Sequence, residues 1–516
     1  MDRSIFSRLN FTGDVALLVY LSLGKLLLHF LTNGQYGYFR DELYYLACGE
    51  HLDWGYVDQS PLIGVIAKTS RMLLGDSLFA IRFFPAVAGA ALVFLMGWLA
   101  RELGGGRFAM ILSAVALLIA PYYLAIGSIL TMNAFEPLFW LLCAVLAVRV
   151  LKYGDSRLWL LFGLVAGVGL MNKHSTLIFG FSFVVALLLT PERKHLLHKW
   201  LWLGGLVAFV VFLPNIVWQI KHGWPTVELL RNADQNQNLP ISPLEFFSGQ
   251  VLLMHPFTLP LWLAGLWFYL FAKAGKAYRV LGWIYVVLFV LMVLMRAKVY
   301  YLAPIYPILL SAGAVAFESF IEQWSWRWWL KPATISLLVL GGAALAPMTL
   351  PVLPVETFIR YAQTLGIESP RTEKLSIAKL PQHYADMHGW EELTQTVARV
   401  YHTLTPEEQA KCAIFASNYG EAGAIDFFGP KYGLPKSISG HQNYFLWGPR
   451  DYTGEIVLTV GEELEDVQEA FNHIELAATF THEYVLPHQN NSPIYICRQP
   501  KAPLKKLWPE AKCYSC

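Results

Sequence analysis

Charged residues are scarce in this 516-residue sequence. They make up 15% of the chain, where a soluble domain has roughly a quarter, and 55% of the residues are hydrophobic. The formal net charge is +2 and the basic residues form no cluster, so a nucleic-acid surface is not indicated. The composition that remains is that of a membrane protein.

Cysteine is also rare, and it does not follow the spacing of a metal site. The six cysteines stand at positions 48, 143, 412, 497, 513 and 516. A disulfide such as Cys412 to Cys497 is compatible with the sequence but cannot be deduced from it. Cys513 and Cys516 have a CxxC spacing, but they do not open a helix after a strand as a redox motif would. The sequence also lacks internal repeats and a glycine-rich loop for nucleotide phosphates.

Long apolar runs are abundant. Crossing the hydrocarbon core takes about 20 apolar residues. Eleven runs approach or exceed that length, near residues 13–31, 79–100, 108–127, 129–151, 157–172, 175–190, 200–219, 249–272, 279–295, 300–320 and 329–350. The first run is longer than the apolar part of a secretory signal, and no small-residue cleavage site closes it. We therefore expect an uncleaved first span.

The loops between these runs predict an orientation. Short basic loops lie at residues 101–107, 149–157, 192–199, 273–279 and 326–331. By the positive-inside rule these loops are cytoplasmic, as is the N-terminal segment with Arg3 and Arg8. An odd number of spans then places the C-terminal region outside. The sequence predicts a multi-pass protein of the cytoplasmic (inner) membrane.

The composition changes near residue 350, after which the chain is charged. Helix-like and strand-like segments then alternate, with helices expected at 385–404, 419–433 and 462–474 and strands at 412–417, 454–460 and 492–499. Such alternation predicts a small α/β domain. We expect a transmembrane domain at residues 1–350 and an extracytoplasmic α/β domain at residues 351–516.

Acidic residues follow the first span, on the predicted outer side. Asp41 and Glu42 are adjacent, and Asp53 and Asp58 come shortly after them. Neighbouring helical residues diverge by about 100°, so only one of the pair can point into a shared centre while the other braces the loop. A carboxylate at a partly desolvated site could take the proton of an acceptor hydroxyl as a general base. Carboxylates also stabilise the first turn of an ordinary helix, and this alternative stays open.

Cations at predicted outer span ends run against the positive-inside rule. These are Lys173, Arg296 and Lys298. A lipid phosphate at the outer interface would explain them, because lysine and arginine stabilise phosphate charge. Each could singly be solvated by headgroups, but ionisable residues at a membrane are functional candidates by default. Tyr300 and Tyr301 could contact a sugar or phosphate or anchor the interface.

Taken together, these elements resemble the polyprenyl-phosphate-sugar-dependent glycosyltransferases of the GT-C class. Within this class the sequence looks like the protein O-mannosyltransferases (glycosyltransferase family 39) and the lipid A aminoarabinose transferases. The resemblance covers roughly residues 10–350 and rests on Asp41-Glu42, Ser60-Pro61-Leu62, "NKHS" at 172–175 and "KVYYLAPIYPILL" at 298–310. It implies that Asp41 is catalytic with Glu42 beside it. It also implies that four residues lie near the donor phosphate: Lys173, Arg296, Lys298 and Tyr301.

Two departures from the family pattern leave roles open. Relatives of the aminoarabinose type carry a lysine near the phosphate where Asp58-Gln59 stand here. Asn133 occupies a position where many members carry an aspartate, and Glu136 follows one helical turn later. An amide cannot act as a base, so a second carboxylate role falls to Glu136 or to none. The candidate substrate-binding residues are Asp58, Gln59, Asn133, Glu136, Tyr300 and His222, which opens a predicted outer turn.

The expected protein is a polytopic α-helical membrane glycosyltransferase with the GT-C fold, about eleven transmembrane helices and a small extracytoplasmic α/β domain. It would move a sugar, with inversion, from an undecaprenyl- or dolichyl-type phosphate to a lipid, glycan or protein acceptor. The alternative is a flippase or transporter of a lipid-linked saccharide, although such a protein would hold polar groups near the midplane between repeated halves. No cofactor is certain. Asp41 and Glu42 can hold a divalent ion, but without a fixed partner they specify none.

Overall fold

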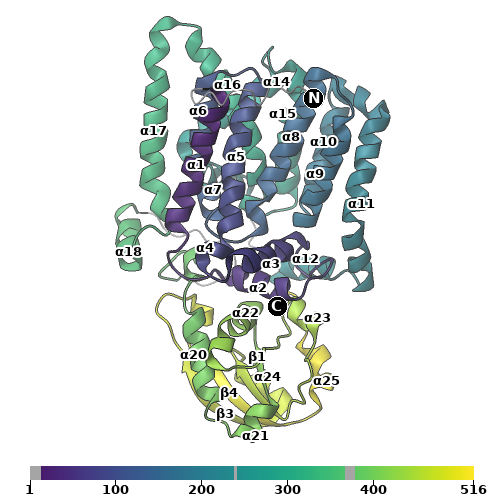
Figure 1. The fold of residues 1–516 in the computed structure, drawn as a ribbon, viewed down its shortest axis with the longest axis vertical. Helices are drawn as coiled ribbons and strands as arrows, with labels where there is room; N and C mark the ends of the chain where they lie inside the picture. Colours follow the sequence, from purple (N-terminus) through teal and green to yellow (C-terminus); the bar gives the residue numbers. More distant parts are fainter. Residues whose placement is uncertain (1–12, 237–240, 367–377, 516) are drawn as a thin grey trace. The chain divides into compact units, whose positions relative to one another are not determined.

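The computed structural model describes residues 13–236, 241–366 and 378–515 (Figure 1). The chain divides into two compact units. The first, here called the membrane unit, comprises residues 1–34, 82–216 and 240–353. The second, here called the sheet unit, comprises residues 35–81, 217–239 and 354–516. The sequence placed one boundary near residue 350, whereas the sheet unit also takes in two earlier segments.

Within the described residues, seven helical segments are long and apolar enough to cross a membrane, or up to nine if each of two bent pairs is one span. The bundle includes α1 (Asp14–Thr32), α5 (Phe83–Glu102), α8 (Glu136–Tyr153), α11 (Lys199–Lys221), α15 (Arg279–Leu294), α16 (Tyr306–Glu322) and α17 (Leu330–Leu345) (Figure 1). Two shorter apolar helices are α6 (Arg107–Ile119) and α9 (Leu158–Asn172). The predicted count of eleven is thus reached only when these short helices and both bent pairs are included.

The bent pairs explain why the apolar runs overcount straight spans. The run predicted at 249–272 is two helical stretches, α13 (Pro243–Leu253) and α14 (Leu259–Leu270), which are joined through a 3₁₀ turn at a 97° bend. Pro256 disfavours helical geometry at the preceding residue, and His255 has a φ of 75°. The second bent pair joins α10 (Thr176–Leu188) to Pro191–Leu197 at 114°. Apolar composition alone does not report such breaks.

Helices α14 and α16 approach each other closely at glycines. A Cβ added to Gly265 would meet the carbonyl oxygen of Leu309, and one added to Gly313 would meet the carbonyl oxygen of Leu261. Small residues at helix crossings let two backbones pack directly against each other, which is a main source of stability between membrane helices. The two glycines therefore set the spacing of this pair.

We expect Gly313→Ala to destabilise the protein by about 1–3 kcal/mol, because the new methyl group meets backbone that cannot yield without moving a helix. The thermal unfolding midpoint of detergent-purified protein measures this effect. Gly180→Ala in α10 is the matched control, because a Cβ there has no atom within 4 Å. Equal midpoints for the two variants would contradict the proposed close crossing.

The sheet unit contains a four-stranded sheet of order β1-β2-β4-β3. β1 and β2 are parallel, and the other two pairs are antiparallel. The strands are β1 (Cys412–Ala416), β2 (Ile456–Val460), β3 (Phe471–Phe480) and β4 (Ser492–Pro500). The helices used below are α2 (Arg40–Glu50), α3 (Leu62–Leu74), α12 (Pro225–Asn236), α18 (Val355–Thr364), α20 (Trp390–Tyr401), α22 (Tyr419–Phe428) and α24 (Leu464–Ala470).

Most of the predicted α/β elements are confirmed, with one error. The helix expected at 462–474 ends at Ala470, and residues 471–480 form β3, an edge strand that the sequence prediction missed. Most positions of β3 are exposed, so it lacks the alternating apolar pattern that reveals a half-buried strand. Pairing with β4, rather than a buried face of its own, holds it in place.

The disulfide considered between Cys412 and Cys497 is absent, because both thiols are free and buried. Cys412 lies opposite Ile456 on β2, and Cys497 lies opposite Val457 from the other side of that strand. The intervening strand keeps the two sulfurs apart. Cys513 is disulfide-bonded, whereas Cys516, and also Arg3 and Arg8, lie outside the described residues.

Helix α2 packs against α22 within the sheet unit, although the two are far apart in sequence. A Cβ at Gly423 would lie 2.9 Å from the carbonyl carbon of Leu43. At the start of α22, the side chain of Arg40 lies against Gly420. This packing brings the first turns of the two helices together and explains why residues 35–81 group with the C-terminal region.

Candidate active-site residues

Asp41 lies in the first turn of α2, at the α2–α22 contact. The hydroxyl of Tyr419, the first residue of α22, donates a hydrogen bond of 2.8 Å to its Oδ1. The Nε of Arg40 lies 3.7 Å from the same oxygen, and the Asp41 side chain remains 29% exposed. Burial raises the pKa of Tyr419, and the Asp41 charge raises it further. Tyr419 therefore stays protonated and donates a hydrogen bond to Asp41, whose carboxylate still reaches solvent.

Glu42, the neighbour of Asp41, is fully buried. Its Oε2 accepts a hydrogen bond of 2.8 Å from the backbone N–H of Phe39, the residue before α2. A carboxylate at the third helical position commonly satisfies such an N–H group. The two members of the acidic pair thus have different environments, with Asp41 accessible and Glu42 bracing the start of the helix.

A second carboxyl group, that of Asp58, lies close enough to Asp41 for the charge of Asp41 to affect its pKa. Asp58 accepts a hydrogen bond of 2.9 Å from the hydroxyl of Tyr44 on α2. Burial raises the pKa of Asp58 to about 7, and the negative charge of Asp41 contributes to the rise. The pKa of Tyr45 is likewise raised, first by burial and then by Asp41 and Asp58. Carboxyl groups with a pKa near the working pH are frequent at reaction centres.

The loop that carries Asp58 is held by a residue from the C-terminal part of the chain. The Oδ1 of Asn443 accepts a hydrogen bond of 3.0 Å from the backbone N–H of Val57. The backbone N–H of Asn443 donates to the Tyr44 hydroxyl at 3.3 Å. Asn443 therefore braces both Asp58 and its hydrogen-bond partner.

Three other predicted residues of the sheet unit lie elsewhere. Gln59 is buried, and its amide nitrogen lies 3.5 Å from the sulfur of Cys48. His222 stacks on the ring of Trp218 at 4.2 Å between centroids. The indole of Trp218 donates a hydrogen bond of 2.8 Å to Asp53. These contacts place Gln59 in a packed interior, and they place His222 and Asp53 in one cluster with Trp218.

In the membrane unit, Lys173 caps the C-terminal end of α9. Its Nζ donates to Asn133 Oδ1 at 2.7 Å and forms an ion pair with Glu136 Oε2 at 2.9 Å. The Lys173 side chain is 13% exposed, whereas that of Glu136 is fully buried. Ser175 donates to the other oxygen of Glu136. The structure thus brings together three of the predicted residues and adds Ser175.

Two tyrosines border this cation. Lys173 Nζ lies 4.8 Å from the ring centroid of Tyr301 and 5.7 Å from that of Tyr300. Distances below about 6 Å are typical of cation–π attraction. Lys298 immediately precedes the turn that carries the tyrosines, Val299–Ile305, whereas Arg296 is exposed after α15 with a φ of 50°. Within the described residues, Arg296 is not among the side chains that contact Lys173.

The described residues contain no group of three or more His, Cys, Asp or Glu side chains that could hold a metal ion. The divalent ion considered for Asp41 and Glu42 gains no geometric support, because Glu42 already caps the helix.

Sequence reasoning missed Tyr419, Tyr44, Asn443 and Ser175. No local signal in the sequence assigned chemistry to the segment that contains Tyr419. Only the packing of α22 on α2 connects it to Asp41, 378 residues earlier.

Comparison with known proteins finds similarity over part of the chain. Residues 58–218 match the family model described as dolichyl-phosphate-mannose-protein mannosyltransferase. The lipid A galacturonosyltransferase RgtD of Rhizobium johnstonii is 28% identical over 229 residues, 42% of this chain and 47% of that protein. The undecaprenyl phosphate-alpha-4-amino-4-deoxy-L-arabinose arabinosyl transferase of Erwinia tasmaniensis is 32% identical over 128 residues, 24% of this chain and 23% of that protein. The chain thus spans less than half the length of each of these relatives.

Solved structures match over a larger share of the chain. ArnT from Cupriavidus metallidurans bound to undecaprenyl phosphate has a TM-score of 0.60 at 15% identity, over 94% of this chain and 98% of that chain. The apo state of the same protein has a TM-score of 0.59. At this identity the likeness establishes the fold, an ArnT-like GT-C fold with several membrane helices and a small α/β sheet region. The predicted fold class is confirmed.

Proposed function

We propose that this chain is a membrane glycosyltransferase with a polyprenyl-phosphate-linked sugar as donor, because residues 58–218 match the family model described as dolichyl-phosphate-mannose-protein mannosyltransferase. The observation that carries the proposal is Lys173, which lies within the matched segment and is bordered by Tyr300 and Tyr301. An interfacial lysine is suited to a lipid phosphate. The names of the two relatives favour an undecaprenyl-type carrier and a lipid-anchored saccharide acceptor.

We assign the general base to Asp41. In the proposed step its carboxylate takes the proton of an acceptor hydroxyl, whose oxygen forms a bond to the anomeric carbon of the donor sugar. The bond between that carbon and the phosphate oxygen breaks, and polyprenyl phosphate leaves with the bonding electron pair. Direct displacement inverts the anomeric configuration. The Tyr419 hydrogen bond orients Asp41, and its accessible side chain can reach a substrate.

We assign stabilisation of the phosphate to Lys173, with Arg296, Lys298 and Tyr301 as further contacts. Negative charge grows on the leaving phosphate as the glycosidic bond breaks, so a fixed cation stabilises the transition state as well as the bound donor. Two of the three Lys173 protons are directed at Asn133 and Glu136. Glu136 therefore holds the lysine in place, and we assign it positioning rather than base chemistry.

We expect kcat/KM for sugar transfer to depend on pH through the ionisation of Asp58. The raised pKa, about 7, leaves this carboxyl largely protonated at pH 6 and ionised at pH 8. Ionised Asp58 would stabilise the positive charge that develops at the anomeric carbon. We expect kcat/KM to rise about tenfold per pH unit below pH 7 and to level off above it. Asp58→Asn should remove this inflection.

The control for this profile is Asp451→Asn, because Asp451 is an exposed carboxylate of the same unit. It should retain the wild-type profile. An unchanged inflection near pH 7 in Asp58→Asn would show that another group titrates.

The proposed function is tested by reconstituting the purified protein in liposomes with radiolabelled undecaprenyl phosphate sugars. A pentose, a hexose and a uronic acid donor should be offered separately, each with lipid-anchored saccharide acceptors. We expect transfer from at least one donor. A flippase would instead move the intact donor between leaflets and leave the sugar-phosphate bond unbroken.

A further inference from the structure

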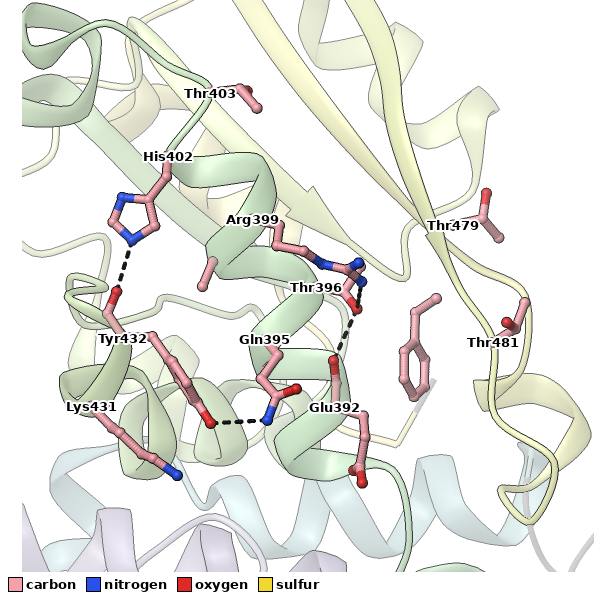
Figure 2. Close-up of a pocket in the computed structure, with 12 residues that line it drawn as sticks. Glu392, Gln395, Thr396, Arg399, His402, Thr403, Lys431, Tyr432, Thr479 and Thr481 are labelled. Atoms are coloured by element: carbon pink, nitrogen blue, oxygen red, sulfur yellow. Dashed lines mark hydrogen bonds between the residues drawn. The ribbon is translucent and has the colours of Figure 1, made fainter.

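The sheet unit contains a groove that is distinct from the residues assigned above. Its volume is about 980 Å³, and it lies between α20, the turn Gly429–Tyr432 and the end of β3 (Figure 2). None of the lining residues belongs to the acidic cluster of Asp41 and Asp58. Its lining mixes donors, acceptors and an aromatic ring. The residues that carry the argument are Glu392, Gln395, Arg399, Tyr432, Phe480 and Thr481.

One wall of the groove is a connected set of hydrogen bonds. Gln395 on α20 donates to the hydroxyl of Tyr432 at 3.0 Å, and this hydroxyl donates to Glu391 at 2.7 Å. Lys431 forms an ion pair with Glu391 at 2.7 Å. Figure 2 shows the bond between Gln395 and Tyr432 and a second bond from His402 to the Tyr432 carbonyl, which measures 2.9 Å. These contacts connect α20 to the turn that carries Lys431 and Tyr432.

Arg399 forms no ion pair within the described parts of the chain. Its guanidinium donates to the Thr396 hydroxyl at 3.0 Å, and no described carboxylate forms an ion pair with it. Figure 2 shows Arg399 extending from α20 toward the strand that carries Thr479. The remaining guanidinium N–H groups present a planar fork, which suits a phosphate or a carboxylate.

The opposite wall offers different chemistry. Thr479 and Thr481 present hydroxyls on either side of Phe480, whose ring is largely buried at 5% exposure. Thr396 donates to the backbone carbonyl of Glu392, and Glu392 itself is an exposed residue of the groove lining. Threonine hydroxyls and a carboxylate exchange hydrogen bonds with sugar hydroxyls, because both partners can donate or accept. The groove thus combines hydrogen-bond acceptors, hydrogen-bond donors and Arg399, an arginine that forms no ion pair within the described residues.

We propose that this groove binds an anionic saccharide, with Arg399 on its phosphate or carboxylate group and Glu392, Gln395 and the threonines on its hydroxyls. The inference rests on the proposed function, because the saccharide would be part of the acceptor. Helix α20 packs on α22 through Trp390 and Gly420, and α22 supplies Tyr419 to Asp41. An acceptor bound to α20 would therefore lie on a helix that packs directly against α22, the helix that orients the proposed base.

Binding to the full-length detergent-solubilised chain tests the proposal without any donor. The probes are a phosphorylated glucosamine disaccharide, the same disaccharide without phosphate, and inorganic phosphate, each titrated by calorimetry. We expect the phosphorylated disaccharide to bind most tightly. Arg399→Gln should weaken it at least tenfold, to the level of the unphosphorylated form, and Arg399→Lys should retain part of the affinity. Arg360→Gln, an exposed arginine on α18, is the matched control and should bind as the wild type does.

The other outcomes are equally decisive. Equal affinity in wild type and Arg399→Gln would overturn the proposal, as would binding of inorganic phosphate as tight as that of the phosphorylated disaccharide. Unfolding midpoints establish that each variant is folded. Because no sugar is transferred in this measurement, its failure is distinct from failure of the proposed function. If transfer occurs, the KM for an anionic acceptor should rise with Arg399→Gln while the KM for the donor stays constant.

Discussion

Asp41→Asn is expected to lower kcat for sugar transfer by about 1,000-fold, within the range typical of a lost general base. Asparagine has nearly the shape of aspartate, and its amide oxygen can still accept the Tyr419 hydrogen bond. The variant should therefore fold and bind donor, but its neutral amide cannot take the proton of the acceptor hydroxyl. Initial rates with radiolabelled polyprenyl-phosphate sugar measure the loss.

Two further variants distinguish the loss of the general base from the loss of the group that orients it. Tyr419→Phe keeps Asp41 ionisable but removes the group that orients it, so we expect a smaller loss, about tenfold, that falls on kcat rather than on the donor KM. Asp451→Asn, an exposed carboxylate in the same unit, should have wild-type rates. Full activity in Asp41→Asn would remove Asp41 from the mechanism.

The second large effect is expected at Lys173. Lys173→Met removes the proposed phosphate contact and should raise the donor KM about 100-fold, as the loss of one charge-assisted interaction of 2–3 kcal/mol implies. The same change leaves Glu136 buried without its cation, and breaking a buried ion pair destabilises a protein by roughly 3–5 kcal/mol. Loss of activity in this variant alone is therefore ambiguous.

The double variant Lys173→Met, Glu136→Gln resolves the ambiguity. With no charge left to bury, it should unfold near the wild-type temperature, yet its donor KM should stay high. Lys173→Arg should recover part of the donor affinity, because it restores the positive charge. If the double variant transfers sugar at the wild-type rate, Lys173 serves only to neutralise Glu136.

The membrane region was the most predictable part of the chain because its signals are local. Apolar runs located the helices, and the spacing from Asn133 to Glu136 already suggested a shared helix end. The grouping of Lys173 with Asn133 and Glu136 required the fold, since the α9–α10 turn meets the start of α8 only in three dimensions. The bend after Leu253 was marked by Pro256, but it cannot be distinguished from a straight span by hydropathy.

The acidic cluster was predictable only in part. Local helix geometry indicated that only one of Asp41 and Glu42 could point into a shared centre while the other braced the loop. The partners Tyr419 and Asn443 come from the other end of the chain, and no periodicity or spacing connects them to α2. The raised pKa of Asp58 also could not be inferred from sequence, because it results from burial and from the negative charge of Asp41, which together outweigh the lowering by the Tyr44 hydrogen bond.

The most direct test of the account is a single-turnover reaction with a donor labelled twice, with ³H in the sugar and ³²P in the lipid phosphate. We expect the labels to separate one for one, with ³H on the acceptor in inverted anomeric configuration and ³²P in polyprenyl phosphate, and we expect Asp41→Asn to slow this separation about 1,000-fold. Labels that remain together while the donor changes leaflet would contradict it and establish a lipid-linked saccharide transporter instead.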